Sequence, residues 1–233
     1  MWSDLFANMS NTNFFNFSFL PKYLPAFVKG FEYTLLLAVV SVALAVIPAL
    51  LLAMMRLSKN RFVRGISGAY IAVFRSTPLL VQLSIIYFGL FQFINLPRYR
   101  FVPGVVALAL NSSAYVAEIF RAGILAVDKG QTEAARSLGL SQWQAMKLVV
   151  LPQAIKNVLP ALANEVVTMV KESSICSTLG MAEIMYAAQT VSGTSYITLA
   201  PYVFAAIIYF CINYPASKAI EAIERRMRRG DKQ

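Results

Sequence analysis

The sequence predicts an all-α membrane protein with five transmembrane helices and a polar loop between the third and the fourth. Of the 233 residues, 58% are hydrophobic and only 14% are charged, which is less charge than a soluble domain carries. No Asp, Glu, Lys or Arg occurs at residues 33–55, 76–97 or 184–217. Each stretch is long enough to supply the roughly 20 apolar residues that cross a bilayer's hydrocarbon core.

The apolar stretches and their breaks place the five spans. We predict them at residues 31–55, 78–94, 102–122, 159–179 and 197–216. The apolar segment 62–74 contains Arg64, Gly65 and Gly68. Two interpretations of it stay open, because it can lie at the membrane interface or extend the second span inward.

Two further positions are expected to bend or interrupt helices. Pro78 leaves a backbone carbonyl free within the second span, which predicts a bend, either beside a translocation path or for packing alone. Gly193 is a breaker within residues 186–195, so we expect this segment to form an outer loop.

The basic residues define the orientation, because they gather in connections that fall on one side of a five-span chain. These are Arg56, Lys59, Arg61 and Arg64, then Lys129, Arg136, Lys147 and Lys156, and finally Lys218, Arg225, Arg226, Arg228, Arg229 and Lys232. Positively charged loops face the cytoplasm, so we expect the N-terminus outside and the C-terminus in the cytoplasm. The same bias explains the formal charge of +10 without nucleic acid as a partner, and the absence of histidine excludes His-based catalysis and metal binding.

One transmembrane domain is expected over residues 1–233. It comprises an external segment at 1–29, a cytoplasmic loop at 127–153 and a cytoplasmic tail at 217–233. The basic, amphipathic part of the tail is expected to continue the last helix and to contact anionic lipid.

The cytoplasmic loop contains the start and stop signals of two short helices. Residues 131–138 are dense in good helix formers, and Gly139 stands where a left-handed terminating residue is needed. Ser141 and Gln144 have the spacing of a capping box, and Pro152 is expected to end the second helix.

The first of these helices can dock another protein. Ala134, Ala135 and Leu138 offer a small apolar surface that permits close approach, and Glu133 can then fix the register. The alternative is an ordinary solvated amphipathic loop.

The loop also carries a family signature. Glu133-Ala134-Ala135, followed by Gly139 and Val149-Val150-Leu151-Pro152, resembles the EAA signature of ABC importer permeases, in which Ile is usual at the place of Val149. Further motifs resemble the polar amino acid branch of that family, namely residues 74–82 with Ser76 at a usual Gly, 111–123, 159–165 and 171–174. The resemblance covers nearly all of the chain beyond Lys29.

The resemblance implies a permease subunit of a type I ABC importer in the bacterial inner membrane. Two such subunits, identical or merely similar, would pair with two ATP-binding subunits, and an extracytoplasmic binding protein would deliver a polar amino acid. The loop then becomes the coupling element, in which Glu133, Ala134, Ala135, Arg136 and Gly139 contact the ATPase. No glycine of this chain precedes lysine, whereas a P-loop needs Gly-Lys-Ser/Thr. We therefore expect a transport subunit that is no enzyme and binds no cofactor, with ATP and Mg on the partner ATPase.

Polar residues within the spans are candidate cavity residues, because charges there are costly. Asn164, Glu165 and Thr168 lie on adjoining stripes of the fourth span. An amide, a hydroxyl and a carboxylate can hold both ends of a zwitterionic amino acid, so we predict that these three residues bind substrate together with Gln82 and Asn111.

Structural interpretations compete with this one. Lys171 can pair with Glu165 or Glu172, and Glu118 with Arg121 at i, i+3 can neutralise each other. An ion-driven secondary amino acid transporter is the alternative function. It would make acidic residues within spans ion sites but would leave the helical loop unexplained.

Overall fold

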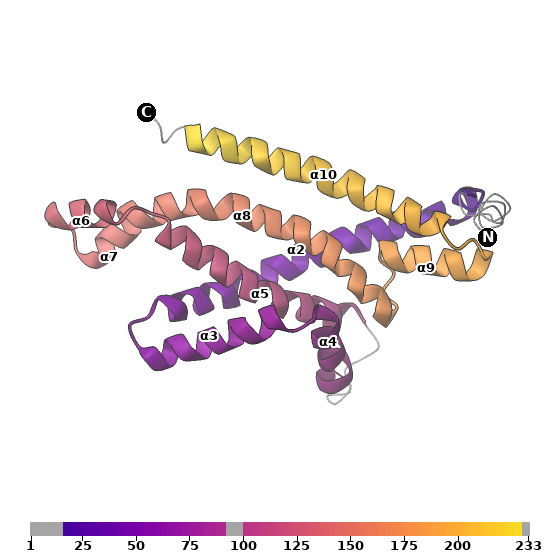
Figure 1. Cartoon of the computed structure of the whole chain (residues 1–233), viewed down its shortest axis with the longest axis horizontal. Helices are drawn as coiled ribbons and strands as arrows, with labels where there is room; N and C mark the ends of the chain where they lie inside the picture. The colour runs from indigo at the N-terminus through magenta and orange to yellow at the C-terminus, as the bar shows by residue number, and fades with distance from the viewer. Residues whose placement is uncertain (1–15, 92–99, 230–233) are drawn as a thin grey trace, which may run out of the picture.

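The computed structural model describes residues 16–91 and 100–229, which form helices and loops without a strand in these two ranges (Figure 1). In chain order the helices are α2 (Leu20–Leu57), α3 (Arg61–Ser76), α4 (Leu79–Ser84), the π-helix η1 (Ile85–Phe91), α5 (Phe101–Leu125), α6 (Lys129–Ser137), α7 (Gln142–Ala145), the π-helix η2 (Met146–Val150), α8 (Leu151–Glu172), the 3₁₀-helix η3 (Ser173–Leu179), α9 (Ile184–Ser195) and α10 (Ala200–Arg229).

Four helical stretches of the described residues are long and apolar enough to cross a membrane. They are Leu20–Leu57, Phe101–Leu125, Gln142–Leu179 and Ala200–Met227. The pair formed by Arg61–Ser76 and Leu79–Gly89 also qualifies, but it is bent by 105°. Counting this pair as one broken span gives the five spans that the sequence predicts, and segment 62–74 is the first arm of that span.

The predicted bend falls at Pro78. Proline disfavours helical geometry in the residue before it, and the backbones of Thr77 and Pro78 are both extended. The break removes helical partners from the carbonyl oxygens of Phe74 and Thr77. The side-chain amide of Gln82 donates to both, at 2.9 and 3.0 Å.

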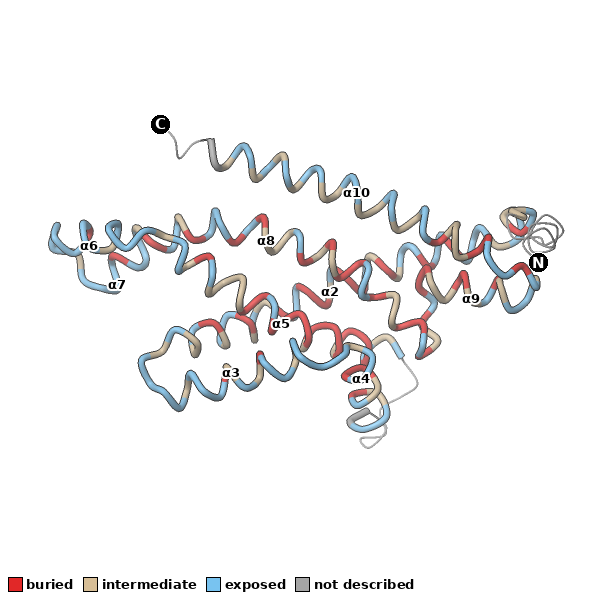
Figure 2. The backbone as a smooth tube through the Cα atoms, in the orientation of Figure 1, coloured by how far each residue is buried: buried red, intermediate tan, exposed pale blue. Residues whose placement is uncertain are grey.

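The core lies where α2, α5 and α8 meet, and Figure 2 shows the buried residues concentrated there and around α9. Leu37 of α2, Leu108 of α5 and Met169 of α8 pack in one cluster, to which α4 adds Leu83. Alanines on the buried face of α2 let α5 approach closely, as small residues do between membrane helices. Packing in this core therefore sets the relative positions of the helices that carry the polar residues.

The expected outer loop at residues 186–195 was wrong, because this segment is helix α9. The buried carboxylate of Glu183 caps its first turn by accepting from the backbone N–H groups of Met185 and Tyr186, at 2.9 and 2.6 Å. Ala187, Ala188 and Val191 are buried in a cluster that includes the N-terminal part of α2. Tertiary packing thus holds a helix that Gly193 alone does not break.

The expected end of the loop's second helix at Pro152 was also wrong. Pro152 lies in the first turn of α8, where its missing N–H group is tolerated. The π-helix η2 connects α7 to α8, and the N–H of Leu151 donates to the carbonyl of Met146. The loop and the fourth span are therefore one continuous helical path.

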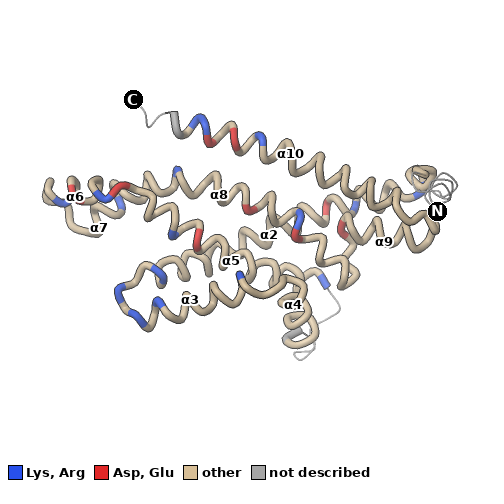
Figure 3. The backbone as a smooth tube through the Cα atoms, viewed as in Figure 1, with Lys and Arg blue, Asp and Glu red and all other residues tan. Residues whose placement is uncertain are grey.

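Basic residues collect at one end of the molecule. Figure 3 shows Lys and Arg positions on α6, at the start of α3 and toward the end of α10, all in the left part of the view. The start of the described chain and α9 lie at the opposite end (Figure 1). The last helix continues through the tail to Arg229, as the amphipathic pattern predicts.

Candidate functional site

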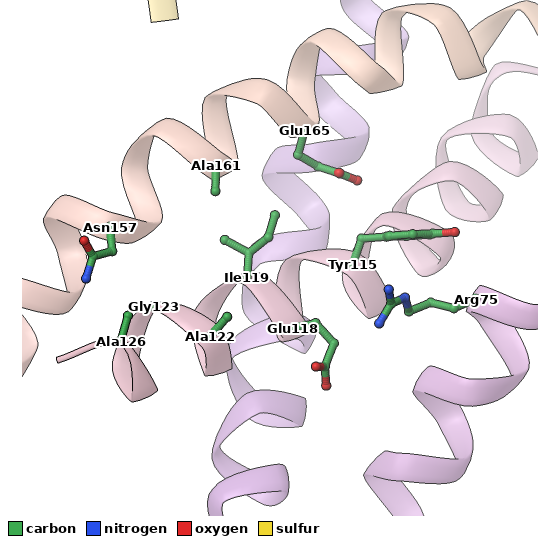
Figure 4. A pocket seen from close by; sticks show the side chains of 10 residues that line it. All are labelled: Arg75, Tyr115, Glu118, Ile119, Ala122, Gly123, Ala126, Asn157, Ala161 and Glu165. Carbon is green, nitrogen blue, oxygen red and sulfur yellow. The ribbon is translucent and has the colours of Figure 1, made fainter. Parts of the chain in front are cut away.

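Two adjoining cavities lie between the broken span, α5 and α8. The larger, of about 480 Å³, has a polar lining of Arg75, Tyr115, Glu118, Asn157 and Glu165 (Figure 4). The smaller, of about 240 Å³, has a polar lining of Thr77, Asn111, Tyr115, Glu165, Thr168 and Glu172. Tyr115 and Glu165 line both. The larger cavity extends along α5 and α8 toward the α6–α7 end, and the smaller extends away from it.

Glu165 lies at the boundary of the two cavities. Its side chain is 8% exposed, and it accepts one hydrogen bond, of 2.9 Å, from the hydroxyl of Ser112. A carboxylate can accept several more. Among the described residues no ion pair reaches Glu165, so the alternative pairing with Lys171 is not present there. Glu165 therefore has free acceptor capacity toward both cavities.

Arg75 is a cavity residue that the sequence interpretation missed. It lies in the last turn of α3, one residue before the charge-free stretch begins. Its guanidinium lies over the ring of Tyr115, 5.3 Å from the centroid. Within the described residues it has no carboxylate at ion-pair distance. The signal that could have found it is an arginine inside the motif at residues 74–82.

Glu118 is neutralised by arginines, as the i, i+3 spacing predicts. Its Oε2 accepts from two nitrogens of Arg121, at 2.7 and 2.9 Å. Arg56, at the end of α2, adds a second guanidinium at 3.6 Å from Oε1. A side chain at Gly68 would meet the guanidinium of Arg56 at 3.1 Å, so this glycine gives α3 room to pass.

Gln82 and Asn111 hold the broken span. Besides the two carbonyls freed at the break, the amide nitrogen of Gln82 donates to the hydroxyl of Thr77 at 2.8 Å. The carbonyl oxygen of Gln82 accepts from the amide of Asn111 at 2.8 Å. Asn111 lines the smaller cavity, whereas Gln82 lines neither of the two.

The remaining predicted substrate residues divide in the same way. Thr168 lines the smaller cavity. Asn164 is exposed on the outside of α8 and lines neither cavity. The structure therefore brings together Asn111, Glu165 and Thr168, and it adds Arg75 and Tyr115.

The loop at the basic end consists of two short, capped helices, α6 and α7. Asp128 caps α6 by accepting from the N–H of Gly130 at 2.7 Å. Gly139 has the predicted left-handed conformation, with a φ of 86°. The predicted capping box of Ser141 and Gln144 is present at the start of α7.

The surface of this element differs from the predicted one. Ala135 is only 3% exposed, and Arg136 donates to the carbonyl of Leu140 at 2.7 Å, so both stabilise the element internally. Glu133 and Ala134 are exposed. Leu138 and Trp143, 84% and 68% exposed, are large apolar side chains without a cover in the described chain. Leu138 belongs to the surface that the sequence predicts, whereas Trp143 is the surface feature that the sequence interpretation missed.

A broken span, a polar cavity among spans and a helical loop at one end are together typical of a transmembrane transport subunit. The chain belongs to the family of binding-protein-dependent transport system inner membrane components, whose family model matches residues 43–229. This confirms the family indicated by the EAA signature and the span motifs.

Relatives match over nearly their whole length. The chain is 43% identical to the putative glutamine transport system permease protein GlnP of Rickettsia prowazekii, over 90% of this chain and 97% of that one. It is 40% identical to the arginine transport system permease protein ArtQ of Bacillus subtilis, over 93% and 99%.

Solved structures agree with the fold. A chain in a crystal structure of an amino acid ABC transporter with histidines superposes with a TM-score of 0.85 at 47% identity, over 91% of this chain and 98% of that one. An inward-facing MetNI methionine ABC transporter has a TM-score of 0.65 at 18% identity, over 86% and 97%, and shows the fold alone.

Proposed function

We infer that this chain is the permease subunit of an ATP-binding cassette importer that moves a polar amino acid into the cytoplasm. The observation that carries this conclusion is Glu165, a buried carboxylate with spare acceptor capacity where two cavities adjoin. Relatives named for glutamine and arginine transport support this class of cargo. The family assignment gives no support to the ion-driven alternative.

The cargo site contains Asn111, Glu165 and Thr168, which line the cavities. Gln82 supports the site by holding the broken span. Asn164 lies outside both cavities on the exposed face of α8, where a second permease subunit covers it. A second subunit is expected there because exposing the polar amide of Asn164 to lipid costs free energy. The second subunit is identical to this chain or a similar one.

The loop of α6 and α7 is the coupling element. Glu133, Ala134, Leu138 and Trp143 face a groove on a separate ATPase subunit, which binds ATP and Mg, while Ala135, Arg136 and Gly139 keep the element folded. Exposed apolar side chains around a register-fixing charge favour protein docking over solvent. The permease itself is not an enzyme.

Motion at the coupling element reaches the cargo site through one helical path. The path α7–η2–α8 runs without a loop from Trp143 to Glu165. At 1.5 Å per residue this is a lever of about 33 Å. When the ATPase subunits close, they rotate this helical path. The rotation exposes the cargo site at Tyr115 and Glu165 first through one cavity and then through the other.

We place the chain in the bacterial inner membrane, with the N-terminus outside and the C-terminus in the cytoplasm. The basic clusters at one end of the molecule support this orientation. The tail at residues 217–233 lies against anionic lipid, and an extracytoplasmic binding protein delivers the amino acid to the opposite face.

Reconstitution tests this function. The permease and its ATPase are placed in proteoliposomes with the binding protein, and uptake of L-glutamine and L-arginine is measured with ATP after an ionophore has collapsed the ion gradients. We expect uptake that requires ATP and does not depend on the ion gradients. Uptake that follows the gradient in the absence of ATP would refute the assignment.

A further inference from the structure

We propose that Arg75 binds the α-carboxylate of the transported amino acid while Glu165 binds its α-ammonium group. The larger cavity would thus recognise the zwitterion common to all α-amino acids. This proposal rests on the proposed function and adds to it a residue and an orientation of the cargo.

The charges lining the larger cavity carry the argument. They belong to Arg75, Glu118 and Glu165. Glu118 is already neutralised, because Arg121 donates two hydrogen bonds to it and Arg56 lies at 3.6 Å. One cation and one anion remain. Within the described residues neither Arg75 nor Glu165 has an ion-pair partner within 4.0 Å, including each other.

The two unpaired groups lie on either side of Tyr115 in the view of Figure 4. Figure 4 shows Arg75 reaching from α3 and Glu165 from α8, both toward Tyr115 of α5. The ring of Tyr115 holds the guanidinium by a cation–π contact without cancelling its charge. Arg75 is thereby oriented in advance, with donors available for a bidentate pair with a carboxylate.

A zwitterionic ligand is the chemistry that satisfies both groups at once. Ionised side chains within membrane spans are costly unless they face a cavity or a partner. A bound α-amino acid supplies the missing carboxylate to Arg75 and the missing ammonium to Glu165, and it brings no net charge from its backbone end. A simple anion or a simple amine would satisfy only one of the two residues.

The test measures binding to the permease–ATPase complex in lipid nanodiscs without any binding protein, since that protein has its own recognition of the amino acid. The probes are L-arginine and L-glutamine, their α-amides, which lack the carboxylate charge, and their N-acetyl derivatives, which lack the ammonium charge. Wild type is expected to bind the free amino acid about 10- to 100-fold more tightly than either derivative, as loss of a charged hydrogen-bonded pair predicts.

The Arg75→Gln variant separates binding from structure. We expect it to lose about 10- to 100-fold in affinity for the free amino acid and to bind the α-amide as wild type does. Glu165→Gln should show the same pattern with the N-acetyl derivative. Lys171→Gln, which removes an exposed charge on α8 outside both cavities, is the matched control and should bind all probes as wild type does.

Equal losses for the free amino acid and its α-amide in Arg75→Gln, or no loss for either, would overturn the proposal. Elution as an intact complex with the ATPase verifies folding. If Arg75→Gln does not assemble, Arg75→Lys carries the test, since lysine keeps the charge but cannot pair bidentately. Its affinity should fall for the free amino acid alone. If the wild-type complex binds no amino acid and shows no ATP-driven uptake, the proposed function fails, which is a different result.

Discussion

Replacing Gly139 by alanine tests whether the coupling element must be rigid. The glycine has a φ of 86°, and a side chain there would meet no atom within 4 Å. The substitution therefore changes the backbone energy and leaves packing alone. The left-handed conformation costs an L-residue about 1–2 kcal/mol relative to its usual helical one.

The magnitude follows from what this conformation holds in place. In this conformation the N–H of Gly139 donates a hydrogen bond to the carbonyl of Arg136, at 3.1 Å. The N–H of Leu140 donates to the carbonyl of Ala135, at 3.2 Å. A penalty of about 1–2 kcal/mol raises local opening of the turn by about 5- to 30-fold, because about 1.4 kcal/mol is a factor of ten. Hydrogen exchange of these two amides measures the opening directly, and ATPase affinity should weaken in parallel.

Gly65 provides the matched control for this prediction. It lies within α3, where an added side chain also meets nothing within 4 Å, but its φ is not positive. Gly65→Ala should stabilise its helix by about 0.5–1 kcal/mol and leave the coupling element unchanged. Unchanged exchange at Leu140 in Gly139→Ala, with the ATPase bound as in wild type, would refute the role of the turn.

Three other substitutions test the remaining parts of the site. Glu133→Lys should uncouple ATP hydrolysis from transport while leaving membrane insertion intact, and normal uptake by this variant would remove the coupling role. Glu165→Gln should change the affinity or the selectivity seen in uptake competition, whereas an unchanged profile would make the residue structural. Gln82→Leu removes the hydrogen bonds that the Gln82 amide donates to the carbonyls of Phe74 and Thr77, and it leaves Phe74 with only the longer bond, of 3.4 Å, from Asn111. Each lost hydrogen bond costs about 0.5–1.5 kcal/mol. A lower melting temperature of the complex is expected, and an unchanged one would contradict the supporting role.

Features with a local physical cause could be predicted from the sequence. The bend at Pro78, the left-handed Gly139 and the capping box at Ser141 depend on the chemistry of residues a few positions apart. The pair of Glu118 and Arg121 lies on one helix turn. The spans could likewise be predicted from the charge-free stretches, because only the length of each stretch and the thickness of a bilayer had to be compared.

Features that join distant segments required the tertiary structure. Helix α9 forms because Glu183 caps it and α2 buries its face, and neither partner is evident from residues 186–195 themselves. Arg75 stands out only once Arg56, on another helix, is seen beside Glu118. Sequence alone thus determined the spans, the turn and capping box of the polar loop, and the family, since these depend on composition and local backbone geometry. The fold decided which charges remain unpaired, because pairing is a property of distances between helices.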